Sequence, residues 1–335
     1  MKVIENPHRS FCRDVAESCP WATFFHSPIW HDIVVAVEPD LKSTPLGFEL
    51  DDGTKGYLPL LEKPSEGKGL IRRYESTHQG CYGGIVADGE VGPEIQAEVL
   101  DEVTGVNIDK ISLTGNPLTD WTVEAPGFEL EDDFTHIIEL DKSFEDILSD
   151  FSRGHRSSMN KAEREGVEVR SSREVEDFER YFKAYQASLE RWGEDASSNY
   201  PWEFFEAVQQ FAEEYPDNIR LWLAEYEGEL ASGALVFYWN RHVDYWHGAA
   251  YKKHFDRRPN NLLHPEIIEH ALGIEDEDGE QQIQYYDFNP SGGHEGVASF
   301  KSRFGADKVE FKRATYRNQV ADAVGNFVSL VGGGD

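Results

Sequence analysis

Residues 220–251, RLWLAEYEGELASGALVFYWNRHVDYWHGAAY, decide the fold of the second half of this chain. A turn at Gly228 separates runs rich in apolar and aromatic residues, which predict strands over 220–226, 230–239 and 242–251. A helical pattern near 262–272 and a strand pattern over 283–288 follow. This alternation of strand and helix signals predicts an α/β protein with mixed sheets.

The first half of the chain repeats that order. A turn at Gly53 joins two strand patterns, and a third strand, a helix and a further strand follow, over 45–50, 56–61, 80–86, 93–104 and 110–113. The offset between the halves is nearly constant: Gly53 precedes Gly228 by 175 residues, and Asn116-Pro117 precedes Asn289-Pro290 by 173. The pattern predicts an internal duplication.

A chain of 335 residues is longer than one hydrophobic core usually grows, so two domains are expected. Their boundary is placed near residue 140, where a strand pattern over 135–140 gives way to a helical one. The predicted domains are 1–140 and 141–320, with a tail over 321–335. No Gly/Ser or Pro tract separates the halves, which predicts two domains packed on one another.

The charge of the chain is strongly negative, with 63 acidic and 32 basic residues and a net charge of -31. The carboxylates are scattered along the sequence and arginine outnumbers lysine. We interpret this coat as adaptation to the salt-saturated cytoplasm of an extreme halophile, where a Debye length of about 3 Å at 1 M salt screens the repulsion. An ordinary acidic protein is the alternative.

Neither a disulfide framework nor a metal site is predicted. Cys12, Cys19 and Cys81 lack metal-ligand spacing, and the twelve histidines form no HExxH motif. No apolar run approaches the roughly 18 residues of a membrane span, and the amino terminus is polar. We therefore expect a cytosolic protein.

Three stretches resemble one known family. FSRGHRSSMNKAEREGVEV (151–169) and YDFNPSGGHEGVASFKSRFGA (286–306) look like the two signature regions of the Fem-type peptidyl or aminoacyl transferases, and FFHSPIW (24–30) is similar to their opening. That family overlaps the BioF2-like acetyltransferase domain. The resemblance implies two tandem GNAT-like domains, the first degenerate, and amide formation by acyl transfer. Better known members of the family transfer amino acids from aminoacyl-tRNA to the stem peptide of a cell-wall precursor.

The chain departs from CoA-dependent GNAT domains at one place. Such domains carry a pattern like R/Q-x-x-G-x-G/A, whose backbone N–H groups hold a pyrophosphate. Here the corresponding residues are Arg257, Arg258, Pro259, Asn260, Asn261 and Leu262, with no glycine. This disfavours CoA, and both acyl-CoA and aminoacyl-tRNA stay open as co-substrates.

Basic residues gather in three islands of the second half, over 151–173, 252–258 and 301–317. Such clustering in an acidic chain predicts a site for a phosphate, nucleotide or carboxylate. Arg153, Arg156 and Lys161 lie on one face of a predicted helix. Arg257 and Arg258 precede a helix whose start we expect between Asn261 and Pro265, with Asn260 and Asn261 beside the anion. Surface ion pairs and a capped helix are the alternatives.

Asp287 ends the strand over 283–288 and is the candidate general base or amine-orienting group. It could instead cap the turn at Asn289-Pro290. Tyr245 and His247, which strand alternation places on one face of the neighbouring strand, are further candidate proton carriers.

Lys301 and Arg303 lie in the predicted SFKSRFG helix, where Phe300 and Phe304 should pack inward. In the family, the matching Phe-Lys pair looks like an element of the substrate side, so Lys301 is expected to polarise the acyl carbonyl or neutralise a phosphate. An exposed lysine is the alternative.

The sequence shows no Ser-His-Asp or Cys-His arrangement, so we expect direct attack by an acceptor amine. Two further hypotheses stay open: a CoA-dependent N-acetyltransferase acting on a small amine or sugar amine, and a binding protein that kept the fold and lost turnover. A long nucleic acid is an improbable partner at this net charge. The sequence does not predict the acyl group, the acceptor or the oligomeric state.

Overall fold

The computed structural model describes residues 1–66, 71–105, 108–119, 127–193, 196 and 198–318. Contacts divide the chain into two compact units. The first contains Met1–Phe134 together with the described residues from Glu310 onward, and the second is Thr135–Val309. The predicted tail, 321–335, lies outside the described residues.

The second unit is built on a sheet whose central strands are antiparallel neighbours. In spatial order the strands are β10 (Val167–Ser172), β11 (Ile219–Tyr226), β12 (Glu229–Trp239), β13 (His242–Ala250), β14 (Tyr285–Asp287) and the last residues of β9 (Phe128–Glu139). β14 runs parallel to β13, and the other pairs are antiparallel. The three strands expected over 220–251 therefore form with boundaries within a residue or two of the prediction.

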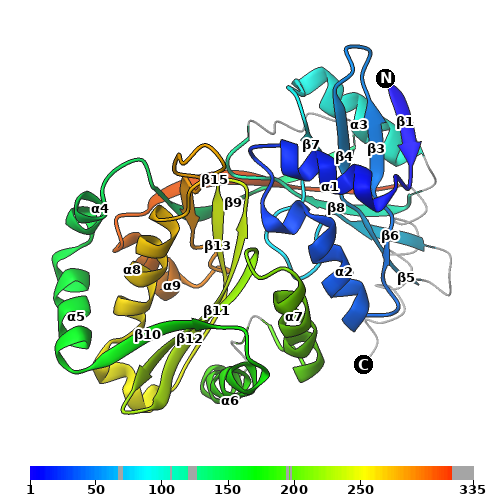
Figure 1. Ribbon diagram of the computed structural model, residues 1–335. Coiled ribbons are helices and arrows are strands. Elements are labelled where there is room, and N and C mark those ends of the chain that lie inside the picture. Colours follow the sequence, from blue (N-terminus) through cyan, green and yellow to red (C-terminus); the bar gives the residue numbers. More distant parts are fainter. Residues whose placement is uncertain (67–70, 106–107, 120–126, 194–195, 197, 319–335) are drawn as a thin grey trace. The chain divides into compact units, whose positions relative to one another are not determined.

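Helices cover both faces of this sheet (Figure 1). α8 (Pro259–Leu272) packs on β10, β11 and β12, and α5 (Arg153–Arg164) packs on α8. On the opposite face α6 (Val175–Trp192) packs on β12 and β13, and α7 (Trp202–Glu214) packs on α6 and β11. β12 is accordingly buried along its whole length after Glu229. The remaining helices are α4 (Phe144–Asp150), the 3-10 helix η4 (Lys252–Arg257) and α9 (Glu295–Ser302).

The prediction for the start of α8 is wrong. The helix begins at Pro259, two residues before Asn261, and Arg258 serves as its N-cap with φ 60°. Proline suits the first helical position because its fixed φ matches a helix and the N–H that it lacks would have no intrahelical partner there.

The first unit contains two sets of strands. β1 (Lys2–Glu5), β3 (Leu46–Glu49), β4 (Lys55–Leu58) and β7 (Val86–Ala87) form an antiparallel sheet. The second set runs in the order β15 (Asp307–Arg317), β8 (Lys110–Thr114), β6 (Ile71–Glu75), β5 (Leu61–Glu66) and β2 (Lys42–Ser43). The helices are α1 (Arg9–Ser18), η1 (Phe24–His26), α2 (Pro28–Val37) and α3 (Pro93–Gly105). Leu58, Leu100 and Ile111 are among the residues of its buried core.

Two strands carry the chain between the units. Residue 134 of β9 belongs to the first unit and residue 135 to the second, and the chain returns between Val309 and Glu310 of β15. The sequence interpretation kept residues up to 320 in the second domain. In the structure Arg313–Arg317 pair with β8, which joins this segment to the first unit.

The pairing of β13 with β14 is short. It covers three positions and ends where Asp244 lies opposite Asp287, although β13 continues to Ala250. Beyond this point the two parallel strands no longer share hydrogen bonds, and the residues that end β14 are available to a site.

Candidate functional site

Asp287 lies at the end of β14 and is 2% exposed. Its Oδ1 accepts hydrogen bonds from Thr135 Oγ1 at 2.5 Å and from the backbone N–H of Asn289 at 2.7 Å. The backbone N–H of Phe288 donates to the carbonyl of His136 at 2.9 Å. These bonds fix the carboxylate at the point where β13 and β14 separate.

Lys301, in α9, is buried at 4% exposure, so the alternative of an exposed helix lysine is wrong. Its Nζ donates to the carbonyl of Asn289 at 2.6 Å and to that of Pro290 at 3.2 Å. Phe304 is buried and its ring packs against Phe300 at 5.0 Å, as the spacing predicted. Lys301 and Asp287 therefore both contact the backbone of Asn289.

Burial and nearby charges lower the pKa of two histidines close to Lys301. His264 is fully buried, its Nδ1 contacts the hydroxyl of Tyr286 at 2.7 Å, and burial lowers its pKa to about 3, with further lowering by the charges of Lys301 and His155. Burial, with the charges of Lys301 and Lys308, also lowers the pKa of His136.

Tyr245 and His247 do not share a face, contrary to the expectation from strand alternation. A β-bulge in the pairing of β12 with β13 sets Tyr245 opposite Val236 but His247 opposite Leu235, and leaves Trp246 unmatched. Tyr245 packs against His264 at 4.7 Å between ring centres. His247 instead contacts the hydroxyl of Tyr181 in α6, at 2.6 Å from its Nδ1.

Neither of these side chains is well suited to carry protons near neutral pH. Burial lowers the pKa of His247 to about 3 and raises the pKa of Tyr245 to about 12. Of the three predicted proton carriers, Asp287 is the one that ends strand β14.

The junction of α5 with α9 brings the backbone next to Arg153 close to the backbone of Arg303. The N–H of Ser152, the N-cap of α5, donates to the carbonyl of Arg303 at 2.8 Å. Both arginine side chains are exposed, and within the part of the chain that the structure describes neither forms an ion pair.

Arg156, by contrast, is occupied within the protein. Its Nη1 donates to the carbonyls of Ser149 and Phe151, the latter at 2.8 Å, and so caps the C-terminus of α4. It shares the predicted helix with Arg153 but serves the fold.

Lys161 and Arg257 meet on one carboxylate. Arg257 Nη1 lies 2.7 Å from Glu165 Oε2, and Lys161 lies 3.6 Å from Glu165 and donates to the carbonyl of Asp256 at 2.6 Å. Arg258 is exposed in the left-handed backbone conformation at the start of α8. Surface ion pairs were the alternative to anion binding for the basic islands. Lys161 and Arg257 form such pairs, both with Glu165.

Asn260 and Asn261 lie in the first turn of α8. Pro259 offers no N–H, and the N–H groups of Arg258 and Asn261 donate to the carbonyls of Phe255 and Arg258. A pyrophosphate cradle needs several free backbone N–H groups, so this segment fits the pyrophosphate of CoA poorly.

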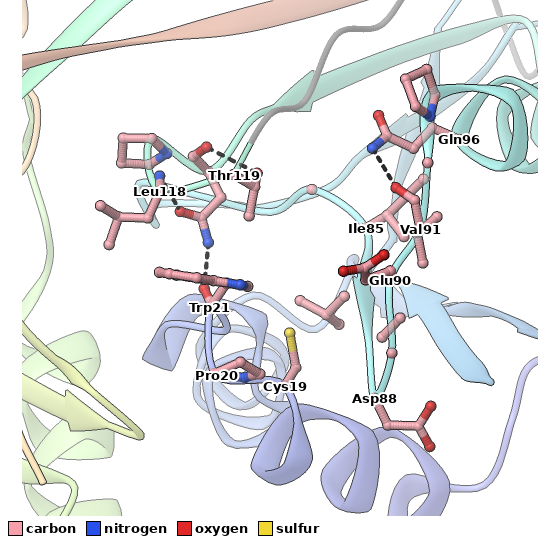
Figure 2. Close-up of a pocket in the computed structure, with 18 residues that line it drawn as sticks. Cys19, Pro20, Trp21, Ile85, Asp88, Glu90, Val91, Gln96, Leu118 and Thr119 are labelled. Carbon is pink, nitrogen blue, oxygen red and sulfur yellow. Dashed lines mark hydrogen bonds between the residues drawn. The ribbon is translucent and has the colours of Figure 1, made fainter.

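The first unit holds a pocket of about 1050 Å³ that the sequence did not reveal (Figure 2). It is lined by the residues that follow α1, by residues 84–93, which lead through β7 into α3, and by the turn at Asn116, with Trp21, Glu90 and Gln96 among its walls. The segment 84–93 supplies glycines at 84, 89 and 92. The turn Asn116-Pro117 here is the counterpart, by sequence offset, of Asn289-Pro290 in the second unit.

Sequence reasoning missed the contributions of Thr135, His264 and the side chain of Asn289. Thr135 is 152 positions from the carboxylate that it contacts, and no local pattern predicts such a pairing.

Among the described residues no group of three or more His, Cys, Asp or Glu is placed to hold a metal ion. No helix in the described ranges combines the length and apolarity that a bilayer span needs.

Comparison with known proteins defines the class. Residues 149–302 match the family described as acetyltransferase (GNAT) domain. A search of curated proteins finds no match. The second unit is thus a GNAT domain, and the chain is an acyltransferase.

The particular layout is that of two GNAT-like domains in tandem, as the resemblance implied. The crystal structure of FemX is similar over 98% of this chain and 100% of its own, with a TM-score of 0.74 and 15% identity. The C-terminal domain of a putative lysylphosphatidylglycerol synthetase from Agrobacterium fabrum is similar over 96% of both chains, with a TM-score of 0.56 and 10% identity. A tandem GNAT protein from the clavulanic acid biosynthesis pathway covers 94% of this chain and 98% of its own, at a TM-score of 0.50 and 12% identity.

Proposed function

We propose that the second unit transfers an acyl or aminoacyl group to an amine by direct attack, with Asp287 and Lys301 as its catalytic pair. One observation carries the proposal: two oppositely charged side chains, both more than nine-tenths buried, contact the backbone of one residue where β13 and β14 separate. Burying charges is costly, and a fold keeps them where they serve chemistry or a specific structure.

The reaction divides between these two groups. The amine nitrogen attacks the acyl carbon and forms the C–N bond, while Asp287 accepts the proton that the nitrogen loses. The ammonium of Lys301 stabilises the negative charge that develops on the carbonyl oxygen. Collapse of the tetrahedral intermediate breaks the bond to the leaving oxygen or sulfur, which takes up a proton to complete the balance.

An anionic partner is expected at Arg153 and Arg303. Their exposed guanidinium groups beside the N-terminus of α5 suit a phosphate on the donor or the acceptor. The Agrobacterium protein is named a putative lysylphosphatidylglycerol synthetase. That name describes a product in which an aminoacyl group is attached to a phosphate-bearing lipid. This supports an aminoacyl donor for the present chain.

A CoA-dependent N-acetyltransferase is the second candidate. The description of the matching family, an acetyltransferase domain, favours it, whereas Pro259 and the bonded N–H groups at the start of α8 disfavour it. A binding protein without turnover is the third.

The test begins with mass spectrometry of metabolites that co-purify with the protein in high salt. Purified protein is then incubated with an amine mixture and either acetyl-CoA or aminoacyl-tRNA, and the acylated amine is measured. Asp287→Asn and Lys301→Met should each lower turnover at least about 100-fold. Lys142→Met is the matched control, because Lys142 belongs to the same unit and pairs with Asp150 on the surface.

The outcome separates the three candidates. Product from aminoacyl-tRNA alone supports the preferred donor, and product from acetyl-CoA alone supports the acetyltransferase. Full turnover in both Asp287→Asn and Lys301→Met would falsify the catalytic pair. Ligand binding without any product would support the third candidate, a binding protein without turnover.

A further inference from the structure

The side chain of Asn289 is buried without a hydrogen-bonding partner. The residue is 2% exposed, and neither Nδ2 nor Oδ1 of its amide meets a donor or acceptor among the described residues. The hydroxyl of Ser291, two positions further, is buried and unpartnered in the same way. Buried polar groups are paired in the great majority of cases, so such an amide calls for an explanation.

The first unit holds the matching side chain, and there it is fully used. Asn116 begins the corresponding Asn-Pro turn; its Oδ1 accepts from the N–H of Leu118 at 2.9 Å, and its Nδ2 donates to the carbonyl of Trp21. Figure 2 shows these bonds to Leu118 and Trp21. The same dipeptide therefore caps a turn in one unit, while in the other its amide takes no part in the turn.

The backbone at Asn289 favours a different residue. Its φ is 60°, in the left-handed region that glycine enters at the lowest cost. The N–H of Asn289 already serves Asp287 and its carbonyl serves Lys301, so neither contact needs a side chain at this position. Asparagine enters this region more readily than other residues with side chains, but its amide is unsatisfied here, where glycine would leave no such group, which indicates that the amide serves a ligand.

We propose that Asn289 is a binding residue for an amide-bearing substrate, with Oδ1 accepting a ligand N–H and Nδ2 donating to a ligand carbonyl. The inference rests on the proposed function and narrows its substrate to molecules with peptide-like amides. Two sources share this chemistry: the pantetheine arm of an acyl-CoA, and a peptide or peptidyl acceptor. The hydroxyl of Ser291 supplies a further hydrogen bond.

Entry of the ligand requires the neighbouring segment to shift. Gly292 and Gly293 are exposed and have φ values of 57° and 81°. Two consecutive glycines carry little steric restriction, so this segment can rearrange at low cost.

The first experiment measures thermal unfolding of two matched variants without ligand. Asn289→Gly removes the unpartnered amide and relieves the backbone, so its unfolding midpoint should equal or exceed that of the wild type. Asn116→Gly removes the two bonds of the same side chain in the other unit, so its midpoint should fall by about 2–4 °C. If Asn289→Gly falls as far as Asn116→Gly, the amide has a partner in the protein and the proposal is overturned.

The second experiment measures binding by calorimetry with acetyl-CoA and with the tripeptide Ala-Ala-Ala. One of the two should bind the wild type, and Asn289→Gly should weaken that binding about tenfold while Asn116→Gly leaves it unchanged. Binding of acetyl-CoA identifies the pantetheine source, and binding of the peptide identifies the other. Equal affinity in Asn289→Gly, or no binding of either probe to the wild type, overturns the proposal.

The catalytic proposal fails separately. Asp287→Asn should keep its affinity for the probe and lose turnover. Weak binding in Asn289→Gly together with full turnover in Asp287→Asn would support the amide-binding role of Asn289 and contradict the catalytic role of Asp287.

Discussion

At the scale of single residues, burial alters the acid–base behaviour of two histidines in the second unit. His247 and His264 each have a pKa near 3 in the folded protein, because both are fully buried. The unfolded chain binds protons at these positions near pH 6.5. Between pH 6.5 and 3 the unfolded state therefore binds more protons than the folded state, and stability falls as the pH is lowered.

We expect the free energy of unfolding to drop by about 2 kcal/mol for each of these histidines between pH 6.5 and 5. Denaturant titrations at pH 7.5, 6 and 5 measure the loss. His264→Gln, which keeps a polar partner for Tyr286, should reduce the slope below pH 6.5 by about 1.4 kcal/mol per pH unit. The exposed His294 supplies the control His294→Gln, and equal slopes in all three proteins would contradict the expectation.

At the same scale, the sequence could single out Asp287 and Lys301 as candidates but could not predict the residues that surround them. A carboxylate at a strand end and a lysine between two inward phenylalanines are local patterns. The left-handed backbone and buried amide of Asn289 depend on residues distant in sequence, so Asn289-Pro290 appeared only as a turn. The sequence around Thr135 does not distinguish it from other threonines in strands. Its contact with Asp287 follows from the pairing of β9 with β14.

At the scale of elements, α4 depends on a side chain from the next helix. Arg156 binds the carbonyls at the end of α4, and charged donors are favourable at a helix C-terminus. We expect Arg156→Ala to lower the free energy of unfolding by about 1–2 kcal/mol and to leave substrate affinity unchanged. Chemical denaturation and the Michaelis constant measure the two effects.

Arg153→Ala, three positions earlier on the same helix, should behave in the opposite way. Its side chain is exposed, so stability should stay within about 0.5 kcal/mol of the wild type. The Michaelis constant for a phosphate-bearing substrate should rise severalfold. An unchanged Michaelis constant would remove Arg153 from the proposed anion site.

Elements with strong local patterns were predicted, and elements defined by distant partners were not. β11, β12 and β13 are rich in apolar and aromatic residues and formed as expected. β15 alternates little and is largely exposed, and its partner β8 lies about 200 positions earlier, so no local signal distinguished it from a loop. The bulge at Trp246 likewise follows from pairing with β12, and it separated Tyr245 from His247.

At the scale of the whole molecule, the net charge of -31 dominates the behaviour in solution. The halophilic interpretation stays a prediction. Raising KCl from 0.1 to 2 M shortens the Debye length from about 10 Å to below about 3 Å and should weaken carboxylate repulsion, so the unfolding midpoint should rise steadily. Calorimetry in KCl, with sucrose as an uncharged control, measures the shift, and a midpoint that stays flat in KCl would refute the interpretation.

The return of β15 to the first unit has a consequence for biosynthesis. A ribosome makes Met1–Phe134 before the second unit, yet β8, which pairs with β6 on one side, gains β15 on the other side only after the whole of Thr135–Val309 has been translated. Until then β8 presents an open edge, the kind of surface on which nascent chains stick to one another. The first unit is therefore completed only after the second has been made, and a chaperone that shields that edge would improve the yield of recombinant expression.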